Sequence, residues 1–510
     1  LDGLSVRFAQ TPETGMAQDF LTVKGTLDEA SQTAVRKAIC GNDLSEGTHA
    51  RFETVRDEST GVWTIRLEVR EDVEPLTAST EWVGPSWTSP DSWTDGVPTA
   101  ATEAVFPANA VVAVPAGAVV GALRFRGAAS LSGASLEIGA EQGAAAIAVE
   151  AGTVEIACPL ALGTSRVPVT VAAGAALTVS GAVTDGTFVK TGDGAFALTG
   201  ENCLRKAVSL AGGCNTLGGA TSVFGIDSLA LGGGTLATLA PLTLPQTRVA
   251  AVPADEPQIV RTDADTTMGP LDVTGLFLKR GAGKLTIDYS SETVSHVLTT
   301  VKTDGKTDEG AAVGLPHDPD GAYSFPSDGS APDGGFAGLT VAEGELVLKG
   351  NPASPTEQKV NGSLLIGMRT PDGTAQPSLT LDGIRVRHHG YGRAWIGLGA
   401  GGAGSFVRSP TLRLVNGAYL IAESTGLGYG SRAGDDFEPT LALTNSTILA
   451  ISQLIWSSSR DLAHPAKVRA KDAALLGLGC AVYIAGAVDA DIDHATVAQN
   501  ESDCGLFAVQ

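Results

Sequence analysis

Arginine, histidine and tyrosine residues gather in one short stretch of the sequence, where their types could support cleavage of an acidic polysaccharide. A uronate lyase needs a cation to neutralise the sugar carboxylate, a base for the adjacent proton and a donor for the leaving oxygen. Arg387 or Arg393 could supply the cation. His388 or His389 could act as the base, and Tyr391 could donate the proton.

The same stretch also fits a solvated strand without any chemistry. Alternation along a strand sends Arg385 and Arg387 to the same outer side, as it does on any exposed strand. The two adjacent histidines, His388 and His389, would point to opposite faces if the strand continues through them. The sequence therefore favours the solvated strand over the catalytic interpretation.

Acidic residues offer two further kinds of site. A glycosidase needs two carboxylates about 5 to 10 Å apart across a cleft, and Asp435, Asp436 and Glu438 lie together in an expected loop. A second group alternates along an expected strand and could bind Ca²⁺ through oxygen ligands, or form the solvated side of that strand. This second group consists of Asp489, Asp491 and Asp493.

Six cysteines are spaced in a way that permits bridges between neighbouring strands. Cys203 and Cys214 are 11 residues apart, and Cys480 and Cys504 are 24 apart. Both spacings would fit disulfides in an oxidising compartment, and the alternative is that the thiols stay free. The two others, Cys40 and Cys158, are expected to be buried. A zinc or redox site is disfavoured, because the sequence contains no C-x-x-C pair.

The strands and turns that must position these residues can be recognised from repeats in the sequence. Residues 188–198 recur as residues 277–287, a near copy 89 residues further on. Each copy predicts a short strand, a tight glycine turn and an alternating strand. Units of this kind cannot each bury an apolar face alone, so they are expected to stack.

The last third of the chain has a clearer repeat of about 30 residues. Ile366-Gly367, Ile396-Gly397 and Leu427-Gly428 recur 30 and 31 residues apart. A Leu-x-Leu segment followed by Asn or Gly recurs with about the same spacing. Each repeat would place the aliphatic residues in a shared core and use Asn or Gly for a left-handed corner. The Leu-x-Leu segments lie at residues 379–381, 412–414 and 441–443.

These repeats predict an all-β chain dominated by a parallel β-helix, or β-solenoid, rather than a sandwich or barrel. Residues 1–76 predict a small α+β or immunoglobulin-like module, with a helix over residues 28–39 and a hairpin joining residues 51–56 to 62–69. The solenoid is expected over residues 77–292 and 338–510, with a loop-rich interlude at 293–337. Three tryptophans, Trp82, Trp87 and Trp93, predict a cap over the open end of the core, and a sugar-stacking platform is the alternative.

Composition narrows the classes of partner. The net charge of -22 disfavours nucleic acid, because phosphate binding needs clustered Lys and Arg, and it disfavours anionic lipid for the same reason. No stretch approaches the roughly 20 apolar residues of a membrane span. The chain opens without Met and is expected to be a processed product or a piece of something longer.

A resemblance supports the solenoid. The pattern Gly192-x-Gly194-x-Phe196-x-Leu198 and its continuation resembles the passenger-associated repeat of bacterial autotransporters, and residues 281–287 match the first half of that repeat. The train of residues in the last third resembles related surface-protein repeats. The resemblance implies a secreted or surface-displayed right-handed β-helix. The chain departs from that family in lacking a recognisable C-terminal membrane barrel.

The expected function is that of an extracellular or bacterial cell-surface structural protein without enzymatic activity, such as a stalk, an adhesin or a filament subunit. Extracellular glycans, surface proteins or other copies of the chain are the expected partners. No cofactor is expected apart from the Ca²⁺ considered above. The alternative is a secreted carbohydrate-active β-helix that binds or cleaves acidic polysaccharide.

Overall fold

The structure is a computed structural model that describes most of residues 78–300 and 337–499. The gaps in these ranges are residues 140–144, 163–165, 185, 205–207, 219–220, 224–228, 245–246, 250–257, 274, 276, 362, 368–375, 390–393, 399–408, 430–437, 458–462, 479 and 485–486. Of the remainder, it describes residues 5–6, 17–24, 39–40, 48–57, 60, 62–71 and 508–509. The chain divides into two compact units, Leu1–Ala230 and Leu231–Gln510.

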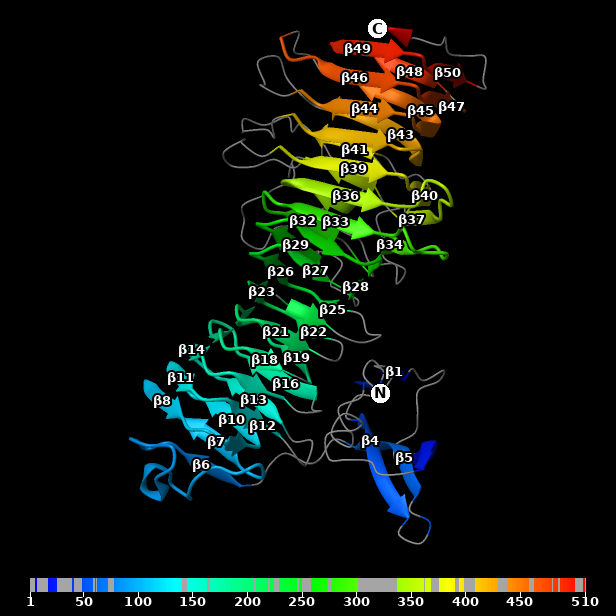
Figure 1. Ribbon diagram of the computed structural model, residues 1–510. Coiled ribbons are helices and arrows are strands. Elements are labelled where there is room, and N and C mark those ends of the chain that lie inside the picture. The colour runs from blue at the N-terminus through cyan, green and yellow to red at the C-terminus, as the bar shows by residue number, and fades with distance from the viewer. Residues whose placement is uncertain are drawn as a thin grey trace. The chain divides into compact units, whose positions relative to one another are not determined.

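In the N-terminal unit, parallel strands follow one another through three sheets, so that each coil contributes one strand to each sheet (Figure 1). The first sheet holds β6 (Ser79–Glu81), β7 (Glu103–Phe106), β10 (Ala122–Phe125), β13 (Ala146–Val149), β16 (Arg166–Val171), β19 (Thr187–Thr191) and β22 (Ser209–Ala211). The second holds β8 (Ala110–Val114), β11 (Ala129–Gly133), β14 (Thr153–Ile156), β17 (Ala176–Val179), β20 (Ala195–Leu198) and β23 (Cys214–Leu217). The third holds β9 (Ala118–Val120), β12 (Leu136–Ile138), β15 (Leu160–Ala161), β18 (Val183–Thr184), β21 (Asn202–Leu204) and β24 (Thr221–Val223).

The C-terminal unit repeats this arrangement with three faces. Its first face holds β28 (Thr247–Val249), β31 (Leu271–Val273), β34 (Val297–Thr300), β37 (Glu357–Asn361), β40 (Arg385–His389), β47 (Ala474–Gly477) and β50 (Thr496–Gln499). Its second face holds β26 (Thr235–Thr238), β29 (Gln258–Thr262), β32 (Phe277–Arg280), β35 (Ala337–Val341), β38 (Ser363–Ile366), β41 (Ala394–Leu398), β48 (Cys480–Ile484) and β51 (Ala508–Val509). The long strands β43 (Tyr419–Tyr429) and β45 (Thr447–Ser457) run through both faces.

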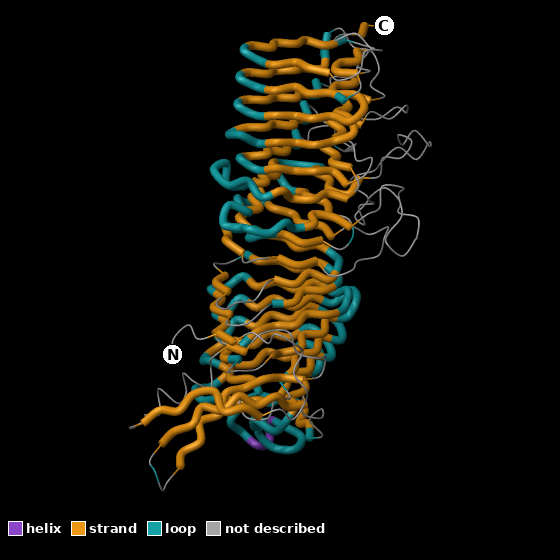
Figure 2. Tube along the Cα trace, turned by 90° about the vertical axis from the view of Figure 1, so that its right-hand side faces the viewer, coloured by secondary structure: helices purple, strands orange, loops and turns teal. Residues whose placement is uncertain are grey.

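The third face of the C-terminal unit is the most regular (Figure 2). It holds β27 (Leu242–Leu244), β30 (Thr266–Met268), β33 (Lys284–Asp288), β36 (Glu345–Lys349), β39 (Ser378–Asp382), β42 (Thr411–Val415), β44 (Thr440–Thr444), β46 (Ala466–Lys471) and β49 (Val488–Asp493). The strand β25 (Leu229–Gly232) spans the division between the two units. The expected parallel β-helix is therefore confirmed.

The 30-residue repeat of the sequence is the repeat of the coils. Leu379, Leu412 and Leu441 stand directly above one another in the third face, and all three are buried. The aliphatic residues of the Ile-Gly and Leu-Gly positions stack in the same way, because Ile366 pairs with Ile396 and Ile396 with Leu427. Both sets of aliphatic side chains therefore form columns within the core, as their spacing in the sequence predicts.

The corner after the third face uses the left-handed backbone that the sequence predicts. The residue that follows the strand has a positive φ in five successive coils, between 44° and 58°. Glycine and asparagine adopt this conformation at low cost, while other side chains are strained there. The five residues are Gly383, Asn416, Asn445, Asp472 and His494.

The two near copies of the sequence each form the predicted strand, turn and strand. The first runs from β19 to β20, and the second from β32 to β33. The second copy begins thirteen described strands after the first, which is not a multiple of the three strands in a coil. The motif therefore specifies a corner of the coil rather than one particular face.

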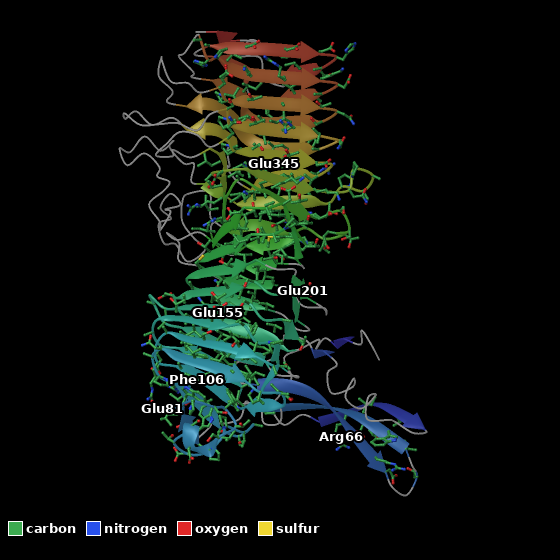
Figure 3. The ribbon with its side chains drawn as sticks, turned by 60° about the vertical axis from the view of Figure 1, so that its left-hand side comes forward. Arg66, Glu81, Phe106, Glu155, Glu201 and Glu345 are labelled. Atoms are coloured by element: carbon green, nitrogen blue, oxygen red, sulfur yellow. The ribbon has the colours of Figure 1, made fainter. Side chains whose placement is uncertain are left out.

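The tryptophan-rich segment closes the first coils of the N-terminal unit (Figure 3, with Phe106 and Glu81 labelled). Trp82, Trp87 and Trp93 are 7%, 3% and 3% exposed, and their rings meet edge to face. The rings of Trp87 and Trp93 also pack on Phe106, which stacks on Phe125 of the next coil. Because the indole rings are buried, they act as a cap and offer no platform to a sugar.

Residues 1–76 contain an antiparallel sheet of β2 (Ala17–Lys24), β5 (Val62–Glu71) and β4 (Thr48–Asp57). The predicted hairpin is confirmed, because Asp57 pairs with Val62 and Thr48 with Glu71. The predicted helix lies outside the described residues except for Ile39, which belongs to strand β3 (Ile39–Cys40) paired with β1 (Ser5–Val6).

Part of the predicted interlude belongs to the stack. Strand β34 forms at residues 297–300 and pairs with β37, while residues 301–336 lie outside the described part. The regular strands resume at Ala337, as predicted. No helix among the described residues is long and apolar enough to cross a membrane.

The leucine column of the third face should carry much of the stability of the C-terminal unit. We expect Leu412→Ala to lower the free energy of unfolding by about 2–5 kcal/mol, because it leaves a cavity between two coils. Arg413→Ala, at the neighbouring exposed position, should change it by no more than about 0.5 kcal/mol. Urea unfolding of the full chain measures both, and equal losses would contradict the assignment of the core.

Candidate functional site

The lyase candidates that the structure describes, Arg387 and His388, do not share one side of their strand. Along β40, Arg385 and Arg387 are exposed, whereas His388 is 4% exposed and faces the core. Alternation along a strand makes this unavoidable, because neighbouring side chains point to opposite sides. His388 and Arg387 therefore cannot act together on one substrate, while the other expected pairing, of Arg387 with His389, stays a prediction. The side chain of His389, and Tyr391 and Arg393 as a whole, lie outside the described part of the chain.

What the first face does bring together is a group of cations on two neighbouring strands. Lys359 of β37 stands directly opposite Arg387 of β40, and Arg385 is two residues along from Arg387 on the same side. All three side chains are exposed. We call Lys359, Arg385 and Arg387 the basic strip.

Two neighbours hold the arginines of the basic strip in place. The Arg387 Nε donates to Glu357 Oε1 at 2.8 Å. The Arg385 guanidinium carbon lies 5.4 Å from the centre of the Tyr419 ring on the next strand, β43, within the range of a cation–π contact. Guanidinium groups fixed in this way present planar forks of N–H donors, which match carboxylate and sulfate oxygens. The arrangement can bind anions.

A polar cluster that the sequence does not predict surrounds His296. Its Nδ1 lies 3.1 Å from Asp272 Oδ2, and its Nε2 lies 3.1 Å from Glu292 Oε2. The imidazole is 6% exposed, and the two carboxylates are 39% and 25% exposed. The backbone N–H of His296 also donates to Gln358 Oε1 at 2.7 Å.

Tyr289 forms the wall of the cluster. Its ring centre lies 5.6 Å from that of His296. Its hydroxyl donates to the carbonyl of Leu271 at 3.2 Å and accepts from the N–H of the same residue at 3.3 Å. Complete burial raises the pKa of Tyr289 well above its usual value, so the phenol stays protonated.

The His296 cluster links coils and is poorly arranged for catalysis. Both ring nitrogens face carboxylates, so neither is available to take a proton from a substrate. The imidazole also fills the space between Asp272 and Glu292 where a glycosidase would hold water or a sugar. The cluster joins β31 to the segment that leads into β34. Its residues come from separate parts of the sequence, and only the i, i+4 spacing of Glu292 and His296 could have drawn attention to it.

The near copies in the sequence each carry a buried lysine at the corner of the coil. The Lys279 Nζ donates to the carbonyls of Arg280 and Gly281 at 2.7 Å each, and to that of Glu343 in the next coil at 3.0 Å. The Lys190 Nζ in the N-terminal unit donates to three carbonyls in the same manner. These are the carbonyls of Gly192 at 2.5 Å, Gly212 at 2.8 Å and Ala211 at 3.2 Å.

Burial perturbs both of these lysines. It lowers the pKa of Lys190 to about 8 and that of Lys279 to about 7, while nearby acidic groups act in the opposite direction. A perturbed lysine in a cleft can be a nucleophile. Here both side chains are fully buried among carbonyl groups, and each ammonium joins its own turn to the turn of the next coil.

The three aspartates of β49 are the strand partners of three cations, not calcium ligands. Lys467, Arg469 and Lys471 of β46 stand opposite Asp489, Asp491 and Asp493, and Arg469 forms an ion pair with Asp489. Residues at i and i+4 of a strand lie about 13 Å apart, too far to hold one Ca²⁺ together. No group of acidic, histidine or cysteine side chains suited to a metal ion is present among the described residues.

Of the predicted glycosidase carboxylates, the structure describes Glu438, which is paired with a lysine. Glu438 Oε2 accepts from Lys467 Nζ at 2.6 Å. This hydrogen bond holds the pKa of Glu438 below its usual value, with His464 acting in the same direction, so Glu438 is a poor proton donor. Asp435 and Asp436 lie outside the described residues.

Of the cysteines, the structure describes two thiols, and both are free. The thiol of Cys214 is free and exposed, so the predicted bridge to Cys203 is not formed. The two residues belong to strands of different sheets, β23 and β21, and the side chain of Cys203 lies outside the described part. Cys158 is buried, as predicted, and burial raises the pKa of its thiol to about 11. The thiol of Cys480, the side chain of Cys40 and all of Cys504 lie outside the described part.

The sequence and the structure were compared with those of known proteins. The chain matches no protein-family model, no curated protein and no solved structure. The resemblance to autotransporter passenger repeats therefore rests on the sequence motifs alone.

The buried lysine of the second copy should make stability depend on pH. Its pKa in the folded protein, about 7, lies below the value of 10.5 for an unperturbed lysine. The folded state therefore binds fewer protons between these values, and stability should increase as the pH rises from about 7 to about 10.5. This contribution is complete above 10.5 and is lost as the pH falls through 7.

We expect Lys279→Met to remove that rise, which should be on the order of a few kcal/mol. Urea unfolding of the full chain across this pH range measures it. Lys284→Met is the matched control, because Lys284 lies in the same motif and is 43% exposed. Identical pH profiles for the wild type and the Lys279→Met variant would contradict the perturbed lysine.

The His296 cluster should stabilise the coils that it joins. We expect His296→Ala to cost about 1–3 kcal/mol of unfolding free energy, because it removes the imidazole that lies between Asp272 Oδ2 and Glu292 Oε2. Hydrogen exchange at the amide of Lys359, which donates to the His296 carbonyl, should quicken as well. His494→Ala removes a histidine that is 76% exposed beside Asp493 and should change neither quantity. Unchanged exchange in His296→Ala would count against the cluster.

Proposed function

We propose that the protein is a structural and adhesive β-helix that acts outside the cell, as a stalk, adhesin or filament subunit. The proposal is supported mainly by one observation: the buried and clustered polar groups of the protein connect neighbouring coils. The ammonium groups of Lys190 and Lys279, and the imidazole of His296, each join one coil to another. Groups that would give an enzyme its chemistry are committed here to holding coils together.

The construction of the stack suits a load-bearing role. Within each unit, neighbouring coils are joined by parallel backbone pairing in all three sheets. The aliphatic columns, such as that of Leu379, Leu412 and Leu441, add apolar contact between the same coils. Because every coil contacts its neighbours in the same way, length is gained by adding coils, as in other solenoids. A spacer or display scaffold needs this property.

The extracellular location is supported by the sequence. The near copies that resemble autotransporter passenger repeats are the segments that form the lysine corners. A net charge of -22 favours solubility at high local density. Both features suit a protein displayed at a bacterial surface.

Cleavage of a polysaccharide is the weaker alternative, since His388, one of the two expected bases, lies on the opposite side of β40 from Arg387. We expect the purified full chain to release no unsaturated uronate from polygalacturonate or alginate. A double variant, His388→Ala with His389→Ala, decides the matter. Turnover by the wild type that this variant loses would refute the structural role.

The location is tested on intact cells that produce the full chain. A membrane-impermeant amine-reactive label should modify the protein without cell lysis, because exposed lysines such as Lys284 and Lys359 are accessible in the fold. A cytoplasmic enzyme of the same cells serves as control and should be labelled only after lysis. Labelling of the chain only after lysis would refute the proposed function.

A further inference from the structure

We propose that the basic strip binds an anionic polysaccharide, a chain of sugars that carry carboxylate or sulfate groups. Lys359, Arg385 and Arg387 form the site on the outer side of β37 and β40, beside Tyr419 of β43. The inference rests on the proposed adhesive function and names the class of ligand that this function would use. It requires binding alone and no cleavage.

The basic strip places like charges next to each other. Lys359 and Arg387 are direct cross-strand partners, so their side chains leave the sheet about 4.8 Å apart. Like charges in this position destabilise a sheet. None of the described carboxylates forms an ion pair with Lys359. The pair gains a physical reason if an anion lies between the two groups.

The third face shows that this chain pairs its charges where only the fold is served. There, the cations of β46 stand opposite the aspartates of β49, residue for residue. Glu438 neutralises Lys467 from the preceding coil at 2.6 Å. The two arrangements contain the same types of residue, so the difference lies in their placement. Lys359 and Arg387 of the basic strip depart from this complementary pairing. Arg261 and Arg280 are also opposite each other, on β29 and β32, but there Asp263 forms an ion pair with Arg261.

The two arginines of the basic strip are held in a fixed orientation without a ligand. Glu357 fixes the Nε of Arg387, and the ring of Tyr419 supports the plane of Arg385. Only one carboxylate, that of Glu357, is paired with the three cations among the described residues, so positive charge remains for a ligand. Preorganised guanidinium forks lose less side-chain entropy on binding a carboxylate or sulfate.

The spacing of the arginines and the apolar surface beside them favour a polysaccharide over other polyanions. Arg385 and Arg387 are about 7 Å apart along β40, which is about the width of one sugar ring, so successive charged sugars can meet successive cations. The same face continues with apolar side chains on β45, where Leu449 pairs with Ile421 and Ile451 is 46% exposed. Such a surface suits the C–H groups of sugar rings. Nucleic acid would need many more cations and would be repelled by the net charge of -22.

Calorimetry on the full chain with polygalacturonate, dextran sulfate and uncharged dextran tests the proposal. We expect binding to at least one of the two anionic polymers, with an affinity that falls as salt is raised, and no binding to dextran. Lys359→Gln with Arg387→Gln should weaken the binding at least tenfold. Arg413→Gln with Lys471→Gln is the matched control, which removes two exposed cations from the third face, and it should bind as the wild type does.

Three results would overturn the proposal: no binding to either anionic polymer, equal binding by the two double variants, or tighter binding to single-stranded RNA than to the polysaccharides. Equal thermal midpoints for the two variants show that a lost affinity does not reflect lost folding. Failure here is distinct from failure of the proposed function. A protein that is labelled on intact cells but binds neither polymer refutes the basic strip alone.

Discussion

The pairing of each coil with the coil before it is the constraint on which the rest of this structure depends. Parallel strands place the same position of successive coils directly above one another, so each side chain must tolerate its own neighbours in a column. Aliphatic columns such as Leu379, Leu412 and Leu441 satisfy this condition well. The corners are harder, because the backbone turns there and its carbonyls leave the ladder.

Polar groups are concentrated at these difficult places. Lys190 and Lys279 direct their ammonium groups at corner carbonyls of two coils, and Asn416 and Asn445 adopt the left-handed backbone at another corner. The His296 cluster does the same where the chain leaves β33 and returns to the first face as β34. A buried lysine with a lowered pKa is therefore understandable here as a structural connection, although the same perturbation in a cleft would suggest a nucleophile.

The outer surfaces are free of this constraint, and the two ways in which they carry charge differ. On the third face, β46 and β49 place cations and carboxylates opposite each other. On the first face, Lys359 and Arg387 place two cations opposite each other. A scaffold that binds through its sides needs a surface of the second kind, while one that only needs to remain folded is served by the first.

Prediction from the sequence succeeded where the residues that stack in one column of the core recur at a regular interval along the chain. The positions of Ile366, Ile396 and Leu427 were sufficient to predict which residues stack, and the tryptophan cap followed from its clustering. The predicted calcium site was wrong, because the aspartates from Asp489 to Asp493 lie too far apart along the strand to share one ion. Of the predicted lyase group, His388 faces the core while Arg387 is exposed, because alternation turns neighbouring side chains to opposite sides.

The sequence by itself determined the class of fold and the period of its coils, because a coil that repeats must repeat its core and corner residues. Only the tertiary structure decided which residues of different coils meet. Asp272, Glu292 and His296 come together because the segment between β33 and β34 lies beside β31 of the preceding coil. The near copies at Lys190 and Lys279 lie a fractional number of coils apart, because the motif encodes a turn and any corner of the coil can accept one.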